Sequence, residues 1–180
     1  MSFLKFLGNK PGEVQPTDPT AVQAETEAVR RIVGRLEALP LDQARLLAGM
    51  AYILARAAYA DLDISDEETA AMERELVQSG VDPSQAVLVV EMAKLQERTT
   101  GGTSDYLVTR EFREHSTAEQ RIAVLRACYR VAAADESISG QESSLLREIA
   151  SELDVDREQA AAIRGEFAEW ISARRGFTAP

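Results

Sequence analysis

Two short acidic segments contain the residues that could do chemistry in this 180-residue chain. They are ADLDISDEE, residues 60–68, and ADESISGQE, residues 134–142. Carboxylate oxygens suit Ca²⁺, Mg²⁺ or Mn²⁺ rather than zinc or copper. The segments therefore predict a divalent-cation site, with one shared ion if they meet in space, and two weak sites or none if they do not. The candidate metal ligands are Asp61, Asp63, Glu68, Asp135 and Glu142.

The two segments are related by an offset of 74 residues. The same offset matches Arg56 with Arg130 and continues without a gap to the pairs Val81-Asp82 and Val155-Asp156. A register kept over about thirty residues predicts an internal duplication. We therefore expect two copies of one helical unit, each with an acidic turn between two helices.

Helix capping offers a second interpretation of the same segments. Ser-x-x-Glu opens a helix as a capping box, which accounts for the serine and glutamate of each copy without any ligand. Asp61 and Asp135 are different, because a carboxylate in the last turn of a helix faces the negative end of the dipole. We expect each to have a compensating partner: Arg56 or Arg130, the N–H groups of the next helix, or a bound cation.

The pattern of a helix, Ala-Asp, a turn and Ile-Ser-x-x-Glu resembles the TerB-like tellurite-resistance family, which is related to the N-terminal domain of the DjlA co-chaperones. The resemblance covers roughly residues 42–174. Family members usually carry Ala-Asp-Gly, and here Leu62 and Glu136 replace that glycine. The resemblance implies a role in the response to tellurite or other chemical stress. It also implies an acidic module, a candidate for metal binding, that associates with membrane-bound partners.

The spacing of apolar residues predicts an all-α fold, a bundle of about seven to eight helices built from two pseudo-symmetric three-helix repeats. The expected helices cover residues 19–38, 41–60, 66–79, 83–98, 105–114, 117–134, 140–153 and 156–174. The expected domain plan is a flexible arm, a helical domain with its two repeats, and a frayed tail: residues 1–18, residues 19–174 with repeats at about 42–98 and 116–174, and residues 175–180. No stretch reads as a strand.

Local signals predict several helix ends. Ser116 and Glu119 read as a further capping box, and Gly80 reads as the left-handed residue after a helix. Asp82 followed by a proline reads as another helix start. In the last helix, the apolar residues at helical spacing predict one inward face: Ile163, Phe167, Trp170 and Ile171.

Composition and charge narrow the function classes. The net charge is −10, and the basic residues, mostly arginine, lie among acids rather than in a stripe. This distribution argues against nucleic acid as a partner and favours a cation or a basic protein. Cys128 is the single cysteine, so we expect a small core residue rather than a disulfide or a reactive thiol. With no signal-peptide pattern and no apolar run of about twenty residues, we expect a cytoplasmic protein, either free or peripheral to a membrane.

Catalysis has little support in the sequence. The single histidine, His115, stands in a polar turn, so neither a nucleophile–base triad nor a zinc site can be assembled around it. We expect a binding protein rather than an enzyme, with a protein partner and no evident small-molecule substrate. The rival interpretation is a metal-free scaffold that recruits a partner or membrane through its helical faces and an N-terminal apolar arm containing Phe3, Leu4, Phe6 and Leu7.

Overall fold

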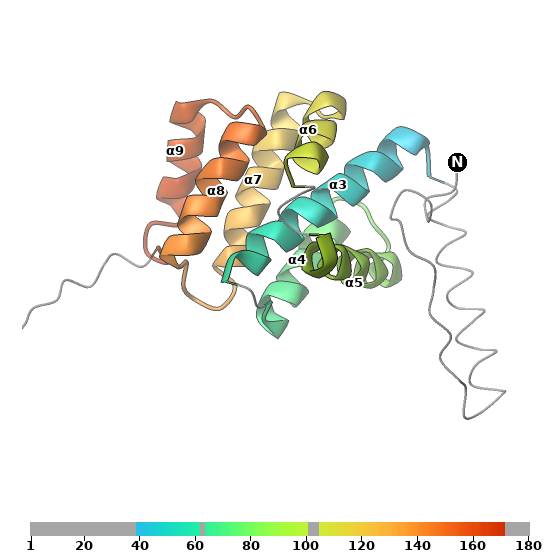
Figure 1. Ribbon diagram of the computed structural model, residues 1–180, viewed down its shortest axis with the longest axis horizontal. Coiled ribbons are helices and arrows are strands. Elements are labelled where there is room, and N and C mark those ends of the chain that lie inside the picture. Colours follow the sequence, from blue (N-terminus) through green and yellow to red (C-terminus); the bar gives the residue numbers. More distant parts are fainter. Residues whose placement is uncertain (1–38, 62–63, 101–104, 172–180) are drawn as a thin grey trace, which may run out of the picture. The chain divides into compact units, whose positions relative to one another are not determined.

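The structure is a computed structural model that describes residues 39–61, 64–100 and 105–171 (Figure 1). The chain divides into two units, Met1–Arg45 and Leu46–Pro180. In the first unit the described residues, 39–45, contain the start of a helix whose Ala44 N–H donates to the Pro40 carbonyl at 3.0 Å. The arm and the helix expected over residues 19–38 lie outside the described residues, as does the tail.

The prediction of an all-α fold is confirmed for the described residues. They form seven α-helices and one short 3-10 helix, joined by turns. In chain order these are α3 (Leu41–Ala58), η1 (Tyr59–Asp61), α4 (Asp66–Gln78), α5 (Pro83–Thr100), α6 (Asp105–His115), α7 (Ala118–Ala132), α8 (Gly140–Glu152) and α9 (Arg157–Glu166). The duplication remains a prediction.

Helix α7 is the element around which the second unit packs. It contacts α4, α8 and α9, while α4 packs against α5 and α8 against α6 and η1 (Figure 1). Its Leu125 and Cys128 are inaccessible to solvent, as are Ile53 and Leu54 of α3. Burying each large aliphatic side chain contributes about 1.5–3 kcal/mol, so these contacts dominate the stability of the unit. The expectation that Cys128 is a core residue is confirmed.

Two of the predicted capping boxes are present and one was wrong. Ser65 begins α4 and Ser139 begins α8, each with the glutamate three residues later. At α7 the cap is Thr117 with Gln120, rather than Ser116 with Glu119. The reason is register: because α7 begins at Ala118, its third residue is Gln120, whose Oε1 accepts from the Thr117 N–H at 2.8 Å.

Matching helix ends occur at positions related by the 74-residue offset. Gly80 follows α4 with a φ of +93°, as predicted for the residue after a helix, and Val81 N–H donates to the Leu76 carbonyl at 3.1 Å. Asp154 follows α8 with a φ of +55°, and Val155 N–H donates to the Ala150 carbonyl at 3.1 Å. Both are the same left-handed helix ending, reached once with glycine and once with an aspartate.

Helix α9 is shorter than predicted. It ends at Glu166, and residues 167–170 form turns, so the expected helix to residue 174 was wrong for this stretch. The Trp170 carbonyl accepts from the Ile138 N–H at 2.6 Å, and Ile138 and Ile171 form an isolated parallel β-bridge. The chain therefore leaves the helical path to pair with the second acidic turn. No strand occurs in the part of the chain that the structure describes.

Candidate functional site

The second acidic turn is held by a hydrogen bond between its own residues. Asp135 Oδ1 accepts from the Ser137 N–H at 3.1 Å, so this aspartate caps the turn that it precedes. Glu136 has a φ of +69°, the left-handed region that favours glycine. This is the position where the resemblance expects glycine. Both carboxylates are exposed, and neither forms an ion pair with a described residue.

The two capping glutamates are buried beneath these turns. Glu142 Oε2 accepts from the Ser139 N–H at 2.6 Å, and Glu68 Oε2 accepts from the Ser65 N–H at 2.8 Å. Their exposed fractions are only 6% and 7%. Each therefore fastens the turn to the helix that follows, with one carboxylate oxygen engaged by the backbone.

The predicted divalent-cation site is not assembled from the described residues, which hold no group of three or more histidine, cysteine, aspartate or glutamate side chains placed for a metal. Asp63 and the Asp61 side chain lie outside the described part of the chain. The backbone of Asp61 closes η1, which packs against α8. Metal binding by the five candidate carboxylates therefore remains a prediction.

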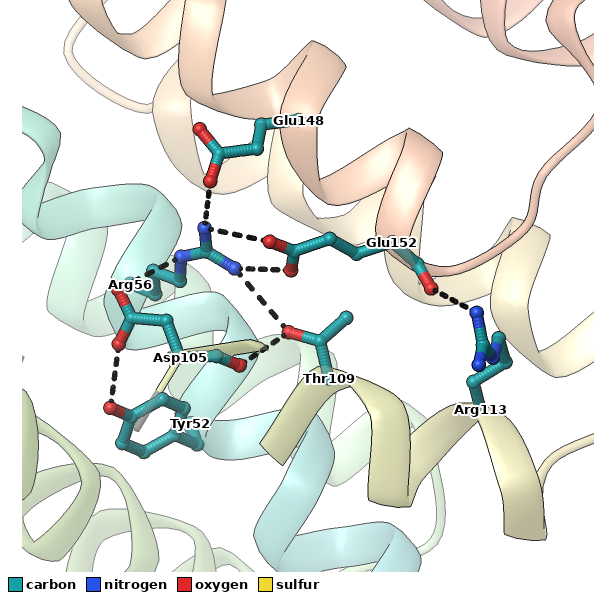
Figure 2. A network of polar contacts seen from close by, with 7 residues as sticks. All are labelled: Tyr52, Arg56, Asp105, Thr109, Arg113, Glu148 and Glu152. Carbon is teal, nitrogen blue, oxygen red and sulfur yellow. Dashed lines mark hydrogen bonds and ion pairs between the residues drawn. The ribbon is translucent and has the colours of Figure 1, made fainter. Parts of the chain in front are cut away.

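A polar cluster surrounds Arg56, which is 3% exposed (Figure 2). Its Nη1 donates to Glu152 Oε2 at 2.6 Å, and its Nη2 donates to Glu148 Oε1 at 2.9 Å. Its Nε lies 3.3 Å from Asp105 Oδ2 as an ion pair. Burial lowers the pKa of Arg56, but the hydrogen bond to Glu152 and the charges of the carboxylates raise it above its ordinary value. One guanidinium thus joins α3, α6 and α8.

Further hydrogen bonds fix the carboxylates around Arg56. Tyr52 on α3 donates its hydroxyl hydrogen to Asp105 Oδ1 at 2.8 Å. Thr109 Oγ1 accepts from Arg56 Nη1 at 3.4 Å and donates to the Asp105 carbonyl at 3.0 Å. Arg113 Nη1 donates to the Glu152 carbonyl at 3.4 Å (Figure 2). Sequence reasoning missed this cluster, because the glutamates are 92 and 96 residues from Arg56.

Arg130, which the 74-residue offset matches with Arg56, makes a simpler contact. Its Nε and Nη2 donate to the two carboxylate oxygens of Glu75 at 2.5 and 2.6 Å. Arg130 was one of three partners that we considered for Asp135, and it binds the buried carboxylate of Glu75 on α4 instead. Arg56 thus pairs with glutamates of α8, the helix after the second acidic turn, and Arg130 pairs with Glu75 of α4, the helix after the first acidic turn.

The single cysteine, Cys128, and the single histidine, His115, are not placed as a nucleophile and a base. Burial raises the pKa of the Cys128 thiol to about 12, so at neutral pH it is protonated and unreactive. His115 is the last residue of α6, and its Nδ1 lies 2.9 Å from the Glu111 carbonyl oxygen.

Comparison with known proteins identifies the family. Residues 47–165 match the family model described as tellurite resistance protein TerB, which is more than half of the chain. The chain belongs to the TerB family. No curated protein and no solved structure matches the chain. The matched range of this TerB-family chain includes both acidic turns, Arg56 and Arg130.

The described carboxylates of this region are of two kinds, which differ in their partners and their exposure. Those of Glu148, Glu152 and Asp105 neutralise a buried guanidinium. Those of Asp135 and Glu136 stand exposed on a turn shaped by left-handed backbone. The second kind is exposed and forms no ion pair with a described residue, whereas Glu148, although 60% exposed, is paired with Arg56. In the described part of this TerB-family chain, no helix is long and apolar enough to cross a membrane.

Proposed function

We propose that this TerB-family chain is a non-enzymatic binding module of the response to tellurite or other chemical stress, and that its acidic turns bind a hard divalent cation. The observation that carries the proposal is the exposure of Asp135 on a turn whose conformation is held from within. Exposed oxygen ligands on a preformed turn suit Ca²⁺, Mg²⁺ or Mn²⁺. The net charge of −10 adds a favourable field for cations.

The capping glutamates support this role by positioning the turn. Because Glu142 is bonded to the Ser139 backbone, the start of α8 cannot move without breaking that bond. Glu68 does the same at the start of α4. The proposal assigns the contacts with the ion chiefly to Asp61, Asp63 and Asp135, and assigns Glu68 and Glu142 to holding the two turns.

Calorimetric titration of the chelator-treated full chain with Ca²⁺, Mg²⁺ and Mn²⁺ tests the proposal. We expect saturable binding by the wild type and its loss in the double variant Asp61→Asn/Asp135→Asn. The matched control is Glu111→Gln/Glu114→Gln, which removes two partly exposed acids of α6 and should bind as the wild type does. No binding up to millimolar concentrations, the weak end of protein calcium sites, would overturn the cation proposal.

A metal-free scaffold is the second candidate function, and exposed apolar side chains on α6 favour it. Tyr106 and Leu107 are 53% and 60% exposed. Large apolar residues on a surface mark partner or membrane contacts when they adjoin one another. Co-sedimentation of the full chain with phospholipid vesicles tests the membrane form of this candidate. Tyr106→Ser/Leu107→Ser should abolish co-sedimentation, and equal sedimentation of wild type and variant would remove the assignment of these residues.

A further inference from the structure

Glu97 on α5 is a buried acid for which neither the capping boxes nor the Arg56 cluster accounts. Its exposed fraction is 6%, and its Oε2 has no hydrogen-bond partner among the described residues. Burying an ionised carboxylate without a partner costs several kcal/mol, and such groups usually become neutral instead. A buried glutamate with an unbonded oxygen therefore indicates a protonated side chain.

The groups that face Glu97 are Tyr52 and Arg56 on α3 and Asp105 on α6. The charge of Asp105 favours the protonated acid, whereas Tyr52 and the charge of Arg56 favour the carboxylate. The single hydroxyl hydrogen of Tyr52 is donated to Asp105, so towards Glu97 the phenol oxygen presents a lone pair. A protonated Glu97 can donate to that lone pair, whereas an ionised Glu97 has to compete with Asp105 for the one hydroxyl hydrogen of Tyr52.

The nearby positive charges are already occupied by other carboxylates. Arg56 is bonded to Glu148 and Glu152 and also faces Asp105. On α5 itself, Lys94 binds Glu91 at 2.8 Å and Thr69 at 3.1 Å. A further negative charge on Glu97 would therefore add to an existing excess of carboxylates.

We propose that Glu97 is a proton-operated latch whose protonated form holds the C-terminal part of α5 against α3 and α6 in the folded domain. When Glu97 loses its proton, the new negative charge faces Asp105 in a desolvated site. The carboxylate gains most by reaching water, which requires this end of α5 to leave its neighbours. The latch makes the α5–α6 region respond to pH.

The consequence for stability has a definite sign. Burial raises the pKa of the Glu97 carboxyl, and the charge of Asp105 raises it further. In the unfolded chain a glutamate ionises with a pKa of about 4.3. Between that value and the raised pKa, the folded chain holds a proton that the unfolded chain has released, so stability falls as pH rises. Above the raised pKa the loss is complete and stays constant.

Urea unfolding of the full chain across pH 4–9 tests the latch, with Glu97→Gln as the variant that mimics the protonated acid. We expect the wild-type unfolding constant, divided by that of Glu97→Gln, to rise by up to about tenfold per pH unit in this window and then level off. The matched control is Glu91→Gln on the same helix, whose side chain is 58% exposed. The wild-type unfolding constant divided by that of Glu91→Gln should not show this rise. A wild-type to Glu97→Gln ratio that stays constant from pH 4 to 9 would overturn the latch.

Two further readouts keep the proposal testable if Glu97→Gln folds poorly. The infrared spectrum of the wild type in heavy water, followed from pH 4 upwards, should show one carboxylic acid that stays protonated at the pH at which the exposed acids have ionised. Amide exchange, corrected for intrinsic rate, should accelerate over residues 93–98 once that band disappears at higher pH. A spectrum without the band at that pH, or exchange protection that does not change, would contradict the latch.

Discussion

Arg56 and Arg130 stand at matching positions of the two predicted copies, yet their surroundings differ. The Arg56 side chain is 4% exposed and contacts carboxylates from two other helices, α6 and α8. The Arg130 side chain is 41% exposed and binds one carboxylate, that of Glu75, through Nε and Nη2. The hydrogen bond to Glu75 raises the pKa of Arg130, as the bond to Glu152 does for Arg56.

The difference shows that arginines at two matching positions of a chain can contribute differently to its stability. Removing one partner from a buried ion-pair cluster leaves a buried charge unpaired. The resulting loss in the free energy of unfolding is far larger than the net stabilisation that the intact cluster provides. In the Arg130–Glu75 pair the arginine side chain is 41% exposed and the glutamate side chain 9%, so water and salt screen the pair in part and it contributes less. We therefore assign Arg56 to the assembly of α3, α6 and α8, and Arg130 to a local clamp between α7 and α4.

The largest expected effect is that of Arg56→Met. Removing the guanidinium leaves Glu152 and Asp105 mostly buried without their cation, and we expect a loss of about 3–5 kcal/mol in the free energy of unfolding. Urea unfolding measures it. Arg126→Met is the control, because it removes an arginine from an exposed pair with Glu166 and should change stability little. Comparable losses in the two variants would break the comparison.

Gly49→Ala tests the packing that brings Arg56 to α6. A Cβ at Gly49 would lie 3.0 Å from Phe112 Cδ2, and Phe112 is buried on α6. We expect a net loss of about 1–2 kcal/mol, since overpacking outweighs the better helix propensity of alanine. In the control Gly165→Ala the new Cβ meets nothing within 4 Å, so a small gain is expected. Thermal unfolding of both variants distinguishes the two signs.

The smallest expected effect is a gain at the second acidic turn. Glu136→Gly should raise the free energy of unfolding by about 0.5–1 kcal/mol, because glycine adopts a φ of +69° without strain. Ala133→Gly is the control, since Ala133 has a φ of −90° and glycine gains nothing there. Equal changes at the two positions would show that the left-handed backbone of Glu136 stores no strain.

Much of the fold follows from local signals, which is why it could be predicted. The apolar spacing indicates α4, α6 and α8 to within about two residues, and the Ser-x-x-Glu boxes locate two of the helix starts. Where two hydroxyl residues were adjacent, Ser116 and Thr117, the pattern alone selected the wrong cap. The end of α9 was also misplaced, because the Trp170 carbonyl bonds to Ile138, a contact set by tertiary packing.

The candidate site was less predictable. Asp135 and the capping glutamates could be identified because their hydrogen bonds join residues two or three positions apart. The Arg56 cluster could not, since its members come from separate helices and no periodicity links them. Glu97 gave no signal either: a single acid near the end of a helix reads as solvated until packing places it against Tyr52.

One experiment tests the central claim, that Arg56 holds α3, α6 and α8 together and that Arg130 is a local clamp between α7 and α4. It is urea unfolding of wild type, Arg56→Met and Arg130→Met at low and high salt. We predict that Arg56→Met loses at least about 2 kcal/mol more than Arg130→Met, and that salt diminishes only the loss in Arg130→Met. Equal losses, or a loss in Arg56→Met that salt removes, would contradict the account.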